Sequence, residues 1–317
     1  MQLPANLEIV RGLPPRGSSM PQARRYTRRL ARRHYENFNF ASLLLPRRLR
    51  QHMYNIYAYC RWADDLADEV AGPERALELL DWWKEQLHRC YAGSADHAVF
   101  QALAETIGQF DIPMTPFLDL LTAFRQDQTV HRYATWEALM GYCRNSADPV
   151  GRLVLYLFGY RDAERQRLSD ATCTALQMAN FWQDVSRDLE KDRIYIPLDA
   201  LSRHGLSESV LLERRFDARY VSLMQELIAR TRELFAAGRP LARQVAPRLR
   251  VDIELFSRAG LAVLDAIERI GYNTLQQRPA LTRVVRLRLL GQALGDRFLA
   301  FGSNAEPEPV TLANHNV

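Results

Sequence analysis

Apolar residues recur along this chain every three or four positions, which is the spacing of one face of a helix. The stretch 49–69 shows this pattern clearly, and 74–91 repeats it directly after Gly72-Pro73, a pair typical of a helix start. The same periodicity predicts further helices over 96–109, 114–125, 135–145, 148–159, 169–190, 208–237, 250–270 and 282–300. Runs that alternate between apolar and polar residues, as strands do, are missing, and no segment repeats at a fixed period. The pattern predicts an all-α protein.

The helical pattern continues without a linker-like stretch from about residue 20 to residue 300. We therefore expect a single domain over 22–301. The first 21 residues carry no clear periodicity, and we expect them to be flexible. The polar segment "GSNAEPEPVTLANHNV" (302–317) is typical of a disordered tail.

Composition favours an ordinary globular protein. Hydrophobic residues make up 47% of the chain and charged residues 25%. The sequence contains no apolar run of the roughly 18 residues that a membrane span needs, and its first residues lack the apolar core of a signal peptide. We therefore expect a cytoplasmic protein. The cysteines are far apart and form no CxxC pair, which predicts buried, reduced thiols at Cys60, Cys90, Cys143 and Cys173.

The net charge of +5 raises the question of an anionic partner. The basic residues are nearly all arginines and are spread along the chain, a distribution that does not predict nucleic-acid binding. The exception is "RRYTRRLARR" (24–33). This run is either the solvated face of an amphipathic helix or a surface attracted to anionic lipid headgroups or to a diphosphate. The second reading would place the protein peripherally at the inner face of the membrane.

Two predicted helices carry acidic ladders. In "CRWADDLADE", Asp64 and Asp68 are four residues apart, and in "QMANFWQDVSRD" the same spacing joins Asn180, Asp184 and Asp188. A four-residue spacing stacks side chains on one helix face, where like charges destabilise an isolated helix by a few tenths of a kcal/mol. Both helices are otherwise rich in apolar residues. Something must therefore neutralise the carboxylates.

Ordinary ion pairs to Arg61 or Arg187 are one explanation, and bound cations are another. The matching spacing on two apolar helices favours cations. Oxygen ligands without nearby His or Cys suit Mg²⁺, which binds one or two carboxylates and completes its shell with water and phosphate oxygens. The sequence motifs of other metal and nucleotide sites do not occur here. A di-iron bundle needs two ExxH motifs, and the chain has one, Glu85 to His88. HExxH, GxGxxG, GxxxxGK[ST] and GxSxG are also missing. These observations predict a magnesium–diphosphate site in a helical cavity.

The two motifs resemble those of the squalene/phytoene synthase family, the head-to-head prenyl transferases. The first family motif, DxxxD, matches Asp64 to Asp68, and the second matches Gln177, Asn180, Asp184 and Asp188. The similarity extends to "LLLPRRLRQHMYNIYAYCR", "YCRNSADPVGRL" and "DRIYIP", and so covers about 26–197 and, more weakly, the helices to about 300. The resemblance implies a single-domain isoprenoid-synthase-type helical bundle around a deep central cavity, with the two motifs facing each other across it.

Departures from the common family pattern point to the hydroxysqualene-forming branch. Asn37-Phe38 in "HYENFNFAS" stands where relatives usually carry Ser-Phe, "SADPVG" (146–151) resembles this branch, and Gln183 replaces an arginine of many relatives. The resemblance implies conversion of presqualene diphosphate and water to hydroxysqualene, with several Mg²⁺ ions and no nicotinamide cofactor. A presqualene diphosphate synthase would hand over the substrate. The alternatives are presqualene diphosphate synthase, squalene synthase or phytoene synthase activity and, outside enzymes, a helical binding or membrane-adaptor protein.

The resemblance also implies roles for individual residues. The metal ligands would be Asp64, Asp68, Asn180, Asp184 and Asp188. Substrate-binding residues would be Asn37, Phe38, Tyr57, Arg61, Gln177, Phe181, Arg193 and Tyr195, with the arginines contacting the diphosphate. Tyr142 matches a family tyrosine near the reacting centre, although a buried core tyrosine would fit the same pattern. His34 lies beside the expected diphosphate end and is either catalytic or structural.

Overall fold

The computed structural model describes residues 8–10, 12–33 and 45–302. Over these ranges the protein is built from helices, with one isolated β-bridge between Arg132 and Ile194. The longer helices are α1 (Met20–Arg33), α3 (Arg47–Asp68), α4 (Pro73–Tyr91), α5 (Ala98–Phe110), α6 (Thr115–Gln126), α7 (Trp136–Ser146), α8 (Asp148–Leu157), α9 (Ala163–Glu190), α12 (Ala218–Gly238), α13 (Pro247–Arg269) and α14 (Arg283–Gly302). Short elements are η1 (Glu8–Val10), α10 (Leu198–Arg203), α11 (Glu208–Leu212) and η2 (Arg239–Arg243). The prediction of an all-α fold is confirmed.

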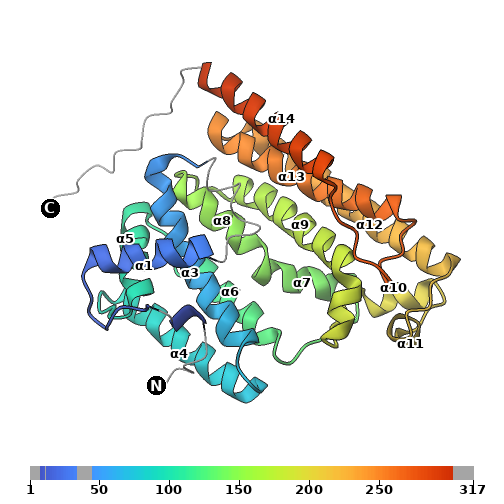
Figure 1. Ribbon diagram of the computed structural model, residues 1–317, viewed down its shortest axis with the longest axis horizontal. Helices are drawn as coiled ribbons and strands as arrows, with labels where there is room; N and C mark the ends of the chain where they lie inside the picture. Colours follow the sequence, from blue (N-terminus) through green and yellow to red (C-terminus); the bar gives the residue numbers. More distant parts are fainter. Residues whose placement is uncertain (1–7, 11, 34–44, 303–317) are drawn as a thin grey trace.

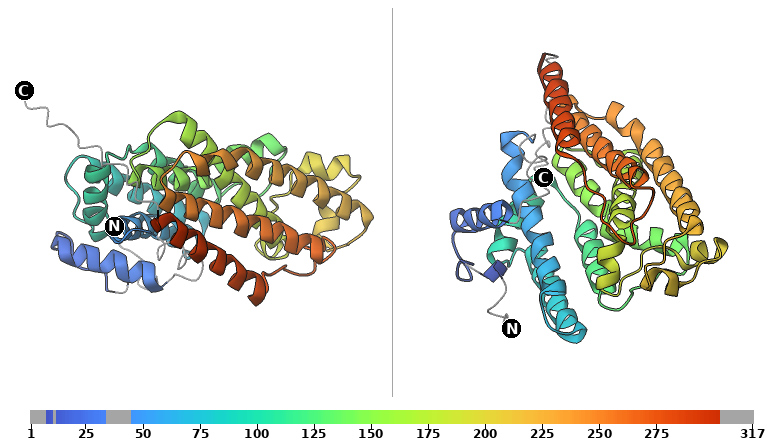
Figure 2. Two further views of the ribbon diagram at one scale, coloured as in Figure 1. Left: turned by 90° about the horizontal axis from the view of Figure 1, so that it is seen from above. Right: turned by 45° about the vertical axis from the view of Figure 1, so that its right-hand side comes forward.

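The helices form two groups joined by α6, α7 and α8. On one side, α3 packs against α1, α4 and α5, and on the other, α9 packs against α12 and α13 (Figure 1). Helix α14 lies along α13 at the outer edge of the second group, as the two further views also show (Figure 2). This arrangement places the helices that carry the two acidic motifs, α3 and α9, in different halves of the protein.

Each half has its own hydrophobic core. In the first half, Trp62 of α3 stacks on Trp83 of α4 with ring centroids 5.0 Å apart, and both side chains are fully buried. In the second half, Trp182 of α9 is fully buried, and its indole Nε1 donates to Thr231 Oγ1 of α12 at 2.8 Å. The Trp62 and Trp182 indoles, whose N–H groups are both hydrogen-bonded, anchor α3 and α9 in their cores.

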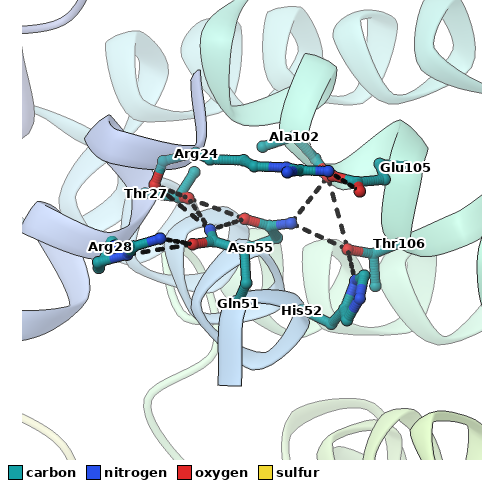
Figure 3. Close-up of polar contacts among 9 residues, drawn as sticks. All are labelled: Arg24, Thr27, Arg28, Gln51, His52, Asn55, Ala102, Glu105 and Thr106. Carbon is teal, nitrogen blue, oxygen red and sulfur yellow. Dashed lines mark hydrogen bonds and ion pairs between the residues drawn. The ribbon is translucent and has the colours of Figure 1, made fainter. Parts of the chain in front are cut away.

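A polar network attaches α1 to α3 and α5 (Figure 3). Thr27 Oγ1 donates to Asn55 Oδ1 at 2.8 Å, and the Asn55 amide donates to Thr106 Oγ1 at 3.0 Å. At the end of this network, the Arg24 guanidinium contacts the Glu105 carboxylate, with Nε 2.7 Å from Oε2. Because these polar groups satisfy one another, their burial is compatible with a tightly docked α1.

The outward face of α1 is rich in arginine. Its buried positions are Ala23, Tyr26, Thr27, Leu30 and Ala31. Arg25, Arg32 and Arg33 are exposed. The expected amphipathic helix is confirmed, and the attraction of its outer face to anionic lipid stays a prediction.

The structure corrects two predicted helices and adds a short one. The single helix predicted over 208–237 is wrong: α11 and α12 are separate, because Asp217 caps α12 by accepting from the backbone N–H of Tyr220, and Arg214 adopts a φ of 51°. Helix α9 begins at Ala163 rather than at 169, since Asp162 caps it there. The pattern also missed α10, which is too short to show periodicity. The cysteines are free thiols, as expected; Cys90 and Cys143 are buried, whereas Cys60 and Cys173 are half-buried rather than buried.

Candidate active site

A cavity of about 330 Å³ lies between α3, α6, α7 and α9. Its lining combines carboxylates and amides with aromatic and aliphatic side chains. The lining residues are Asp64, Asp68, Leu120, Ala123, Phe124, Asp127, Tyr142, Ser146, Gln177, Asn180, Phe181, Asp188, Arg193 and Tyr195. A concave site with convergent polar groups and an apolar wall is the usual form of a ligand pocket.

The first acidic motif occupies the C-terminal end of α3. Asp64 and Asp68 line the cavity, whereas Asp65 is buried and forms an ion pair with Arg61. The Arg61 Nη1 also lies 3.3 Å from Asp64 Oδ2. Burial raises the pKa of Asp64 and raises that of Asp65 to about 6. Arg61 and Tyr57 are outside the cavity lining, so Arg61 acts here on the motif itself.

The second motif lies on α9. Gln177, Asn180 and Asp188 line the cavity, and Asp188 has its pKa raised to about 7 by burial and by the neighbouring Asp184 carboxylate. Asp184 is not part of the lining. Its carboxylate forms an ion pair with Arg278 that uses both oxygens, with Nη2 3.2 Å from Oδ2. Within the described residues, Arg278 therefore neutralises the Asp184 carboxylate. Burial favours the neutral form of Asp188.

The segment that follows α9 connects the two motifs across the cavity. Arg193 Nη2 lies 3.3 Å from Asp68 Oδ1, and Lys191 Nζ lies 3.8 Å from Asp68 Oδ2. Two residues further on, the Tyr195 ring stacks on Phe181 of α9 with centroids 3.9 Å apart. The Arg193 guanidinium thus sits at the acidic end of the cavity, next to the aromatic wall.

Tyr142 of α7 joins this wall and binds an acid that sequence reasoning missed. Its hydroxyl donates to Asp127 Oδ2 at 3.1 Å. Burial raises the pKa of Asp127 to about 6 and also raises that of the Tyr142 hydroxyl. The other oxygen of Asp127, Oδ1, is buried and has no hydrogen-bond partner among the described residues. Asp127 therefore lines the cavity with one carboxylate oxygen bound to Tyr142 and the other buried without a partner.

The predicted site residues are brought together in part. The structure places Tyr142, Gln177, Phe181, Arg193 and Tyr195 in the lining, together with the metal-ligand candidates Asp64, Asp68, Asn180 and Asp188. Asp184, Tyr57 and Arg61 lie outside the lining. His34, Asn37 and Phe38 are outside the described residues. Asp127 and Arg278 were missed because neither belongs to a spaced motif, and Arg278 meets Asp184 across 94 positions of sequence.

The carboxylate and amide oxygens that line the cavity fit Mg²⁺ when a diphosphate provides some of the ligands of the ion. In the part of the chain that the structure describes, no three His, Cys, Asp or Glu side chains converge closely enough to hold an ion by themselves. Mg²⁺ does not need such a cage, since it commonly binds one or two carboxylates and takes its other ligands from water and substrate phosphates. Asp64 and Asp68 provide such an oxygen pair on α3, whereas Asn180 and Asp188, two turns apart on α9, each provide a single oxygen ligand.

The described helices include none that is long and apolar enough to cross a membrane.

The chain is similar in sequence and in structure to several known proteins. Residues 31–285 match the family model described as squalene/phytoene synthase. The chain is 35% identical to hydroxysqualene synthase from Rhodopseudomonas palustris over 80% of this chain and 84% of that protein. It is 30% identical to phytoene synthase from Arthrospira platensis over 79% of this chain and 85% of that protein. Among solved structures, squalene synthase HpnC from Alicyclobacillus acidocaldarius matches with a TM-score of 0.78 and 48% identity, covering 80% of this chain and 96% of the other. The fold is that of an isoprenoid-synthase-type helical bundle.

Proposed function

Because the chain belongs to the squalene/phytoene synthase family, whose members process prenyl diphosphates, we propose that it converts presqualene diphosphate and water to hydroxysqualene and diphosphate. The observation that carries this proposal is one cavity that is lined by residues of both acidic motifs and by a cluster of aromatic rings. Two relatives named hydroxysqualene synthase, each 35% identical, support the choice within the family. The departures at Asn37, at 146–149 and at Gln183 support it further.

The acidic end would bind the diphosphate. Asp64, Asp68, Asn180 and Asp188 would hold magnesium, with Asp184 as a further ligand, and the bound ions would neutralise the charge of the departing diphosphate. Arg193 lies between the two motifs and offers a planar guanidinium that can bind two phosphate oxygens. The carbon–oxygen bond then breaks with its electrons going to the diphosphate, which leaves a carbocation on the C30 chain.

The aromatic wall would stabilise that carbocation. Tyr142, Phe181 and Tyr195 form a continuous cluster, with the Tyr142 and Tyr195 centroids 6.0 Å apart. Aromatic faces attract cations by about 0.5–2 kcal/mol each. Ring opening moves the positive charge along the chain, and a water molecule then forms the new carbon–oxygen bond. Asp127, held by the Tyr142 hydroxyl, would accept the proton that this water releases.

The cavity volume sets a condition on binding. A volume of about 330 Å³ is at the low end of pockets that enclose drug-sized ligands, which span roughly 300–1,000 Å³. A C30 chain with its diphosphate therefore requires the cavity to widen. The neighbouring space of about 10 Å³ shares Phe181, Asp188, Arg193 and Tyr195 with the cavity, so movement of the Phe181–Tyr195 stack would enlarge it.

Product analysis tests the proposal. Purified protein with Mg²⁺ receives presqualene diphosphate, farnesyl diphosphate or geranylgeranyl diphosphate separately, with and without NADPH, in ¹⁸O-labelled water. We expect labelled hydroxysqualene from presqualene diphosphate, with no diversion to squalene by NADPH. Squalene as the main product, or efficient condensation of prenyl diphosphates to presqualene diphosphate or phytoene, would assign one of the other family reactions. Release of no diphosphate from any prenyl diphosphate would support the binding or adaptor alternative.

A further inference from the structure

The segment that connects α13 to α14, residues 270–282, is held against the second half of the protein at two places. Thr274 and Leu275 are fully buried, and Thr274 Oγ1 shares a 2.8 Å hydrogen bond with the Tyr220 hydroxyl of α12. Pro279 is buried as well, whereas the Arg278 side chain is 33% exposed. Arg278 therefore projects from a fixed backbone next to α9.

The second of these attachments is made by Gln183 of α9, which is buried. Its Nε2 donates to the Pro279 carbonyl at 2.8 Å, and its Oε1 accepts from Arg278 Nη2 at 3.3 Å. The same Arg278 guanidinium forms the ion pair with Asp184 described above. One amide thus holds both the backbone of the connecting segment and the side chain that it carries.

The chemistry of the amide explains why glutamine suits this position. A primary amide offers donors and an acceptor, whereas arginine and lysine offer donors alone. A cationic residue at position 183 could satisfy the Pro279 carbonyl, but it could not accept from Arg278 and would repel it. An apolar residue would leave the buried Pro279 carbonyl unpaired, which is unfavourable.

We propose that Gln183 is a positioning residue, which holds Arg278 beside Asp184 so that the guanidinium is ready to bind the diphosphate of the substrate. This inference rests on the proposed function for the identity of the anion. An arginine side chain that is already fixed loses less conformational freedom when the ligand arrives, and binding is tighter for that reason. Gln183 itself does not contact the ligand and acts through Arg278.

A double-mutant cycle on the binding of inorganic pyrophosphate with Mg²⁺, measured by isothermal titration calorimetry, tests this role. We expect Arg278→Gln to weaken binding about tenfold or more, as loss of a hydrogen bond to a charged group does. Gln183→Met, which is nearly isosteric, should weaken binding severalfold. In the Arg278→Gln background the Gln183→Met change should have less than about a twofold effect, because coupled residues are not additive. Unchanged binding in Gln183→Met, or an equal loss with and without Arg278, would overturn the proposal.

Controls separate positioning from general effects of charge or folding. Arg232→Gln removes an arginine that pairs with Asp265 and Glu268 on the surface of α12 and α13, and it should leave pyrophosphate affinity unchanged. A loss equal to that in Arg278→Gln would show a long-range charge effect and contradict the proposal. If Gln183→Met does not fold, Gln183→Asn takes its place in the cycle, since its shorter amide cannot reach both partners. The assay needs no turnover, so a failure of the proposed reaction would leave this coupling measurable.

Discussion

Asp148, the acid of the "SADP" sequence, offers a test of the structure through the pH dependence of stability. Its carboxyl is 3% exposed and accepts a 2.7 Å hydrogen bond from Thr174 Oγ1, which ties α8 to α9. Burial raises the pKa of Asp148 from 3.8 to about 7. The folded protein therefore binds this proton more tightly than the unfolded chain does. The contribution to stability is fully present below the unfolded pKa and is lost as the pH rises through the folded one.

The size of the effect follows from the shift. About three pKa units at about 1.36 kcal/mol each give about 4 kcal/mol of unfolding free energy lost between acidic pH and pH 8. Asp148→Asn should remove most of that loss, because the amide oxygen can still accept from Thr174 and no buried charge forms. We expect the variant to be more stable than the parent at pH 8 by up to about 4 kcal/mol, with the difference shrinking toward pH 4.

Urea unfolding at a series of pH values, followed by circular dichroism, measures this difference. Thr174→Val is the matched control, since it removes the donor but keeps the acid, and its pH dependence should be at least as steep as that of the parent. A constant difference between Asp148→Asn and the parent at all pH values would refute the reasoning, as would a less stable variant at pH 8.

Other predictions concern the site and the surface. Asp64→Asn should lower turnover at least about a hundredfold without unfolding the protein, since it removes a main source of transition-state stabilisation, and turnover unchanged by EDTA would contradict the metal assignment. Because the pKa of Asp188 is raised to about 7, binding of Mg²⁺ with pyrophosphate at pH 6 should release more protons from the parent than from Asp188→Asn. Calorimetry in buffers of different ionisation enthalpy measures this release, and equal release from both proteins would show that Asp188 is not a ligand. If α1 docks on lipid, the binding of the protein to anionic liposomes should weaken as the salt concentration rises, and the double variant Arg25→Glu/Arg32→Glu should bind more weakly than the parent. Equal binding to neutral and anionic vesicles would show that this face is simply solvated.

The sequence predicted those features that local periodicity determines. A helical repeat fixes which residues share a face, so the stacking of Asp64 with Asp68 could be read from spacing alone. The family resemblance drawn from the two motifs is confirmed by the match over 31–285. The facing of α3 and α9 came from that resemblance, because spacing within one helix carries no information about another.

Features that depend on tertiary contact or on short capping signals were not predictable in this way. Arg278 is one arginine among many and meets Asp184 across 94 positions. Asp127 gains its role from a bond to Tyr142 of the next helix. The division of the predicted helix at Asp217 depends on one capping side chain, and the apolar periodicity on either side obscured it.

The arginines at the site differ in how firmly they are bound, and this difference suggests how the acidic motifs can exchange partners. Arg61 pairs with Asp65, whose side chain is 2% exposed, and removing the partner of a buried charge is strongly unfavourable. Arg193 and Arg278 pair with Asp68 and Asp184, whose side chains are 35% and 16% exposed. Because these two carboxylates are more exposed than Asp65, water can solvate them when an arginine leaves, and exchange of the partner costs less than it would at Asp65. We therefore expect Arg61 to stay with Asp65 when a magnesium–diphosphate binds, while Arg193 and Arg278 transfer to phosphate oxygens and release the two carboxylates for the metal.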